Sequence, residues 1–129
     1  MAYLNPLIYD NGLTYLVANA TRLDICTTEP TDFLQATSTF SLGRKLDIEF
    51  GNPEEMILVP GRRVVLPEIT DGEVLVSSTS AANDAEFWAI TDTVNSALLA
   101  TGPLLEADLV TAGDGFTLTP IGIGLPYPA

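Results

Sequence analysis

Acidic side chains are the most numerous charged groups in this sequence that could do chemistry. Seventeen Asp and Glu residues stand against five Lys and Arg residues, and there is no histidine. Glu54 and Glu55 are adjacent, Asp71 and Glu73 flank a glycine, and Asp114 lies between two glycines. None of these groups repeats the Asp-x-Asp-x-Asp-Gly spacing of an EF-hand loop. The pattern predicts no metal site of that kind and leaves open a calcium site built from loop oxygens.

The hydroxyl and thiol groups lack neighbours that would activate them. A serine or cysteine nucleophile needs an adjacent base or cation, and the usual base, histidine, is missing. Cys26 is the single cysteine, so it cannot form an internal disulfide, and a buried structural thiol is expected. We therefore expect no enzyme activity, no catalytic residue, no metal and no cofactor. A small carbohydrate-active enzyme with two paired carboxylates is the enzymatic alternative.

The charge balance indicates which partners the surface repels. The formal net charge is −12 at pH 7. An acidic surface repels nucleic acid and anionic lipid, so we expect neither as a partner. No apolar run reaches the roughly 18 residues of a membrane span, and the first residues lack the basic and apolar regions of a secretory signal. We therefore expect synthesis in a reducing cytoplasm.

Alternating apolar and polar residues, with turn signals every ~8–12 residues, predict a mainly β fold. We expect a single domain, residues 1–129, that is an antiparallel β-sandwich or barrel-like domain with one or two short helices near the N-terminus. In the strand that begins at Arg22, Leu23 and Ile25 are expected on the buried side and Asp24 on the other. The expected helices are 13–19 and 31–36, the expected strands are 22–28, 40–42, 45–50, 62–69, 73–78 and 116–118, and the expected turns are at Gly43 and 70–72.

The clearest local pattern is a β-hairpin around the only tryptophan. Residues 86–92 and 97–102 read as its strands, and 93–96 as its loop. A simple turn would place Ile90 opposite Leu99 and Trp88 opposite Thr101. Trp88 is expected to anchor the core. Residues 103–110 read as either a loop or one helical turn.

Both ends of the chain are apolar and uncharged, and four of the five basic residues form two adjacent pairs. We expect residues 1–9 and 120–129 to be extensions that either pack on their own domain or contact a partner, and we expect deletion of 120–129 to weaken binding more than folding. The basic pairs are expected to orient docking onto an acidic partner surface. The candidate interface residues are Tyr3, Leu4, Leu7, Arg44, Lys45, Arg62, Arg63, Ile121, Ile123, Leu125 and Tyr127.

Several segments resemble small structural proteins of tailed bacteriophages that infect alphaproteobacteria. The resemblance is carried by residues 85–104 (AEFWAITDTVNSALLATGPL), by Asn11-Gly12-Leu13, by 20–30 (ATRLDICTTEP) and by 39–43 (TFSLG). It implies a virion component. Within that class the small, acidic, β-rich chain is most similar to a capsid decoration (cement) protein that takes part in viral assembly.

The resemblance also implies partners and a location. A decoration protein binds the outside of the head and bridges subunits of the major capsid protein, so the expected partners are that protein and neighbouring copies of this chain. Such proteins are often dimers or trimers, and nothing in the sequence sets the symmetry. The expected location is the capsid exterior, after synthesis in the host cytoplasm. A tail or head-fibre component that contacts the host surface is the alternative within the virion.

Overall fold

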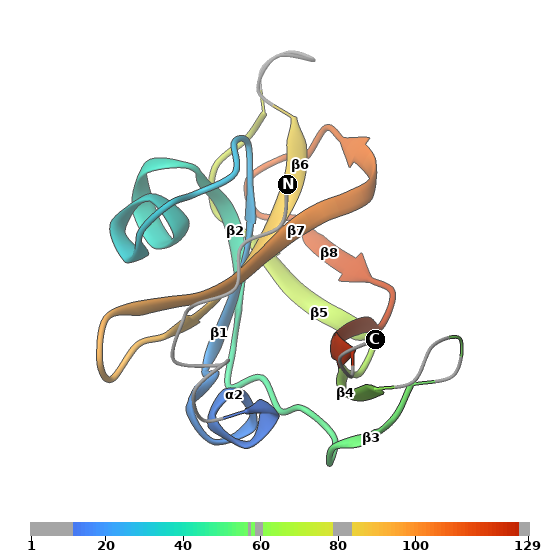
Figure 1. The fold of residues 1–129 in the computed structure, drawn as a ribbon. Coiled ribbons are helices and arrows are strands. Elements are labelled where there is room, and N and C mark those ends of the chain that lie inside the picture. The colour runs from blue at the N-terminus through green and yellow to red at the C-terminus, as the bar shows by residue number, and fades with distance from the viewer. Residues whose placement is uncertain (1–11, 57, 59–60, 79–83, 127–129) are drawn as a thin grey trace.

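The chain folds into two antiparallel β-sheets that do not close into a barrel (Figure 1). The structure is a computed structural model that describes residues 12–56, 58, 61–78 and 84–126, with the backbone alone at 106–108 and 126. The predicted fold class is confirmed. The described elements are α2 (Leu13–Asn19), β1 (Arg22–Cys26), the π-helical segment η1 (Gln35–Thr39), β2 (Ser41–Leu46), β3 (Glu54–Glu55), β4 (Gly61–Leu66), β5 (Ile69–Val74), β6 (Ala85–Asp92), β7 (Ala97–Asp108), β8 (Gly115–Leu118) and β9 (Ile121–Pro126).

The larger sheet places β1 at its centre and β7 and β8 at its two ends. Its strand order is β7-β6-β1-β2-β5-β8, and the smaller sheet has the order β3-β4-β9. Figure 1 shows the long β6/β7 hairpin crossing the molecule, with β5 and β8 curving away from it. A core of buried Leu, Ile, Val and Phe residues draws on both sheets and on α2. No helix within the described part of the chain is long and apolar enough to cross a membrane.

The predicted hairpin is present, but its predicted register is wrong by one residue. Ile90 pairs with Ala100, not with Leu99, and Trp88 pairs with the residue after Thr101. The register shifts between Ile90 and its successor, so one residue of β7 has no partner there. Such a β-bulge adds a residue to one strand of a pair and changes which side chains face each other.

The hairpin loop is closed by the side chain of Asp92. Its carboxylate accepts hydrogen bonds from the backbone N–H of Val94 at 2.9 Å and of Asn95 at 3.2 Å. The Asn95 side-chain amide donates to the same carboxylate at 2.7 Å. Ser96 then takes a left-handed backbone conformation with φ 52°. Asp92 is therefore explained as a turn-closing residue, which is a common role for aspartate.

Two glycines predicted to turn the chain lie inside strands instead. A Cβ atom on Gly43 in β2 would lie 2.6 Å from the backbone oxygen of Glu73, and one on Gly72 in β5 would lie 2.4 Å from the ring of Phe116. These positions need glycine because a neighbouring strand or ring comes too close for any side chain. The turn predicted at 70–72 is accordingly part of β5.

The second predicted helix and the predicted strand 45–50 are both displaced. The helical segment is η1 at 35–39, where the Asp32 carboxylate accepts the Gln35 N–H at 2.8 Å. Strand β2 ends at Leu46, because Asp47 has a left-handed φ of 55° that breaks the extended backbone. Ile48 beyond this break is still buried in the core.

The predicted C-terminal extension contributes a strand to the smaller sheet. Residues 121–126 form β9, which pairs with β4 at six positions from Leu66↔Ile121 to Gly61↔Pro126. Ile123 is 8% exposed and belongs to the core. The region 103–110, which the sequence left open, continues β7 as far as Asp108. Removal of 120–129 should therefore disturb folding directly, which revises the expectation for this segment.

Candidate functional site

The two predicted basic pairs lie on strands of different sheets. Arg44 and Lys45 are in β2 of the larger sheet, and Arg62 and Arg63 are in β4 of the smaller one. They are not brought together within a single strand pair. Since they do not share a sheet, the geometry offers two separate basic sites, not one combined spot.

Three of these basic residues contact groups of the chain itself. Lys45 Nζ lies 3.0 Å from an Asp71 carboxylate oxygen. Arg63 Nε lies 2.8 Å from a Glu54 carboxylate oxygen. An Arg62 amino group donates to the backbone oxygen of Pro53 at 3.1 Å.

Arg44 is placed by the register opposite Asp24 on β1 and Glu73 on β5, which are both acidic. Most of the positive charge is thus balanced internally, and the net acidic charge dominates what a partner meets.

The other predicted interface residues divide into three groups. Ile121 and Leu125 are half-buried in β9 and pack against the core. Ile123 is buried and has no accessible surface to offer a partner. Tyr3, Leu4, Leu7 and Tyr127 lie outside the described residues.

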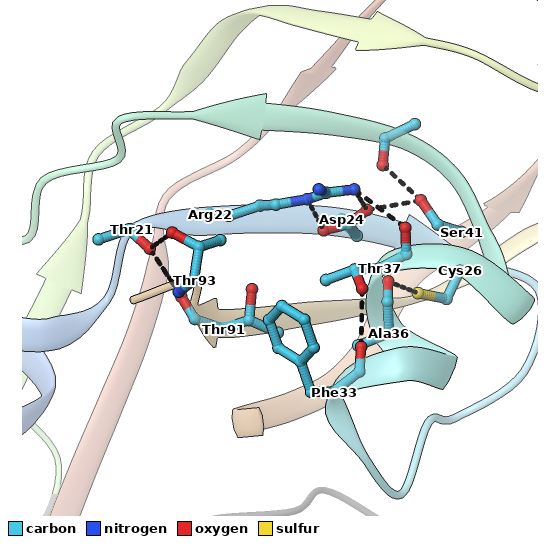
Figure 2. Close-up of polar contacts among 11 residues, drawn as sticks. Thr21, Arg22, Asp24, Cys26, Phe33, Ala36, Thr37, Ser41, Thr91 and Thr93 are labelled. Carbon is cyan, nitrogen blue, oxygen red and sulfur yellow. Dashed lines mark hydrogen bonds and ion pairs between the residues drawn. The ribbon is translucent and has the colours of Figure 1, made fainter. Parts of the chain in front are cut away.

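A polar cluster around the buried Asp24, which sequence patterning did not reveal, lies between β1, β2 and η1. We call Arg22, Asp24, Thr37 and Ser41 the Asp24 cluster. Figure 2 shows the guanidinium of Arg22 and the hydroxyl of Ser41 meeting at the Asp24 carboxylate. Arg22 donates from Nε and Nη2 at 2.7 and 2.8 Å, and Ser41 donates from Oγ at 2.5 Å. Arg22 also donates to the Thr37 backbone oxygen at 3.1 Å, which ties η1 to the sheet.

The Asp24 carboxyl is sealed from solvent, with 0% exposure. Burial raises the pKa of Asp24, while hydrogen bonds from Arg22 and Ser41 oppose that shift. Both carboxylate oxygens are occupied by donors from the chain, so no acceptor faces a substrate. The cluster is explained as a structural clamp. The sequence of β1 alternates in polarity, so it predicts that Asp24 faces solvent. In the structure that face is covered by η1, and for this reason the sequence did not reveal the cluster.

Cys26 is a buried thiol beside the same helical segment. Its Sγ donates to the backbone oxygen of Ala36 at 3.5 Å. Burial, with a smaller contribution from the charge of Asp24, raises the pKa of Cys26 to about 12. The reactive thiolate is therefore scarce at neutral pH, and the predicted structural thiol fits this environment.

A concave feature of the described residues is an apolar pocket of about 610 Å³. We call it the seam pocket. Its walls come from β1, β6, β7, β8 and β9, and among the side chains that the structure describes they include no charged one. Pockets of this size and character bind apolar ligands or segments. The lining consists of Ile25, Ala85, Trp88, Val110 and the stretches 103–105 and 116–122.

Two aromatic rings of the seam pocket lie against glycines on neighbouring strands. Trp88 pairs with Gly102, and a Cβ on Gly102 would lie 2.4 Å from the indole ring. Phe116 pairs with Gly72 in the same way. A ring that covers a glycine on the next strand fixes the register and shields the backbone. These pairs hold two walls of the pocket in place, and the predicted anchoring role of Trp88 agrees with its packing against the core.

The described residues contain no group of three or more Cys, Asp or Glu side chains that could hold a metal ion. The lining of the seam pocket offers apolar side chains and strand backbone, which can bind an extended segment or an apolar molecule. Comparison of the chain with protein-family models, with curated proteins and with solved structures finds no match.

Proposed function

We propose that this protein is a bacteriophage virion component, and specifically a capsid decoration protein. It would bind the outside of the head and bridge subunits of the major capsid protein. The proposal starts from the resemblance carried by residues 85–104, 20–30 and 39–43. The confirmed β fold is compatible with it, because a rigid β domain suits a part that adds to a shell.

The single observation that carries the proposal furthest is the charge-free seam pocket in a chain of net charge −12. An apolar concavity of this size is a binding feature more than a folding necessity. The buried Asp24 carboxylate accepts hydrogen bonds from Arg22 and Ser41 and is therefore not open to a partner. Among the described residues, the groups open to a partner are therefore suited to association, which is what a decoration protein does.

Decoration of a shell needs only modest affinity at each site. A shell presents many equivalent sites, and a protein that bridges two subunits gains from the high effective concentration of the second contact. Binding to the assembled form alone stabilises it by mass action. The acidic surface also keeps free copies apart before they attach, because like charges repel.

The experiment that tests this function is a count of copies per purified virion by quantitative mass spectrometry, with the major capsid protein as internal standard. A decoration protein is expected at a copy number comparable to that of the capsid subunit. A count of only a few to a few tens per particle would contradict the proposal and favour a tail or head-fibre part. Absence from washed virions would remove it from the virion altogether.

A further inference from the structure

The seam pocket lies where the larger sheet fails to close. Strands β7 and β8 are the first and last strands of that sheet, and both line the pocket. Each contributes consecutive residues, 103–105 from β7 and 116–118 from β8. Successive side chains of a strand point to opposite faces, so a run of consecutive lining residues presents the edge of the strand and its backbone. The pocket is therefore a gap between two strands.

The register of β8 shows which backbone groups face this gap. Val74 in β5 donates to the backbone oxygen of Asp114 at 2.9 Å, and Gly72 pairs with Phe116. Alternate residues of an antiparallel strand direct their N–H and C=O groups to the same side. The backbone groups of Asp114 and Phe116 that form these contacts thus face β5. Thr117, which lies between Phe116 and Leu118, directs its N–H and C=O groups to the opposite side. Within the described residues, β8 pairs with β5 alone, so the Thr117 backbone has no strand partner.

Charge limits what can occupy the gap. No charged residue belongs to the lining among the side chains that the structure describes, and all five basic residues, which are described, lie outside it. The neighbouring charged residues in the described chain are acidic: Glu86 next to Ala85, and Asp114 just before β8. An uncharged apolar segment fits the gap, and basic residues beside that segment would complement the net charge of −12. Leu105 in the lining is exposed, and exposed Leu109 lies four residues further along the chain, so the apolar surface near the pocket favours a polypeptide over a small molecule.

We propose that an extended, uncharged, apolar segment of the capsid subunit, flanked by basic residues, adds as a strand along β8 in the seam pocket. This inference rests on the proposed function, which supplies the partner. Main-chain hydrogen bonds at Thr117 give the added strand its direction, and the apolar walls around Trp88 and Leu105 bind its side chains. Strand addition to an open sheet edge is a recurrent way to recognise a peptide.

The first test replaces Thr117 with proline. Thr117→Pro removes the N–H that faces the gap and leaves the hydrogen bonds to β5 in place, a substitution that edge strands tolerate. Thr117→Val is the matched control, because it keeps both the N–H and the branched side chain. Labelled full-length protein is titrated onto heads purified from a phage deleted for this gene, and binding is measured by co-sedimentation. We expect T117P to bind about ten-fold more weakly than T117V and the wild type.

A second pair of variants keeps the test informative if T117P fails to fold. Leu105→Asp puts a charge on a side chain that is 89% exposed at the pocket, whereas Leu34→Asp changes one that is 65% exposed and outside it. Neither substitution removes a core contact, so both variants should melt like the wild type. We expect L105D to lose head binding by about ten-fold and L34D to bind normally.

The possible results separate this inference from the proposed function. If the wild type binds heads and all four variants bind equally well, strand addition at the seam is wrong while the decoration role stands. If the wild type does not bind heads, the decoration role fails and the named partner fails with it. Equal weakening by T117P and T117V would overturn the backbone contact. A wild-type oligomer without heads that T117P dissociates would assign the seam to a second copy and overturn the capsid segment.

Discussion

Substitution of Gly102 by alanine tests whether the Trp88 wall of the seam pocket is as close-packed as the structure indicates. The added Cβ would lie 2.4 Å from one indole carbon and 2.6 Å from another. Real carbon atoms do not approach so closely, and the contact is with a rigid ring. The φ of Gly102 is not positive, so alanine meets no backbone strain there. The whole effect must therefore come from displacement of Trp88 or of its strand.

The expected size follows from the cost of overpacking a core. Forcing an extra methyl group into a filled site costs about 1–3 kcal/mol. For a domain of this length, about 4 °C of melting temperature corresponds to 1 kcal/mol, so we expect a drop of about 4–12 °C. Because Trp88 is the only tryptophan, its emission reports the ring displacement directly. The emission maximum should move to longer wavelength as the ring becomes more exposed.

The matched control is Gly122→Ala, in another wall of the same pocket. A Cβ on Gly122 meets no atom within 4 Å, so this variant should melt within about 2 °C of the wild type and keep its emission maximum. The assay is thermal unfolding followed by circular dichroism and by fluorescence. A Gly102→Ala protein with unchanged melting temperature and unchanged emission would refute the packing described for Trp88.

Four further predictions follow from the interior and from β9. Asp24→Asn replaces one of the two acceptor oxygens used by Arg22 and Ser41 with an amide NH2 group and should lower the unfolding free energy by about 1–3 kcal/mol in urea titrations; a change below ~0.5 kcal/mol would contradict the clamp. Because burial raises the pKa of Asp24 above 3.8, the folded state holds that proton more tightly, so the unfolding free energy of the wild type should fall as pH rises from about 3.8 through the raised pKa; D24N, which has no carboxyl group at this position, should lack this part of the pH dependence. Cys26, with a pKa of about 12, should react with iodoacetamide at pH 8 only after unfolding, and rapid native alkylation would show the thiol to be accessible. Deletion of 120–129 removes β9 and the buried Ile123, so it should lower the melting temperature by at least ~10 °C, and a normal melt would return this segment to the role of a free extension.

Features that depend on neighbouring residues could be predicted from the sequence. Helix 13–19 and the hairpin at 86–102 follow from local periodicity and a polar loop, and both are present. The bulge that shifts Ile90 by one residue was not predictable, because loop length alone does not reveal an extra residue within a strand. Gly43 and Gly72 were misread as turns for a related reason. These positions need glycine because a strand or ring that is distant in sequence lies too close for a side chain.

Features that depend on the order of strands in space could not be predicted. Asp24 appears solvent-facing in an alternating strand, and only the arrival of η1 and Ser41 buries it. The seam pocket arises because β1 pairs with residues of β6 that lie more than 60 positions after it in the sequence. In the resulting sheet, β7 and β8 are the two end strands. The candidate interface from sequence therefore includes Ile121 at the pocket wall, but it misses Leu105, Thr117 and Trp88.

We propose that this chain decorates a capsid through the seam between β7 and β8, and an electron-microscopy reconstruction of heads with and without the protein is the sharpest test of that role. We expect extra density over the outer surface of the shell at many equivalent sites, with the seam facing a capsid subunit and a strand of that subunit beside β8. Density confined to the tail or to a single vertex, or a seam that faces solvent in the bound protein, would contradict it.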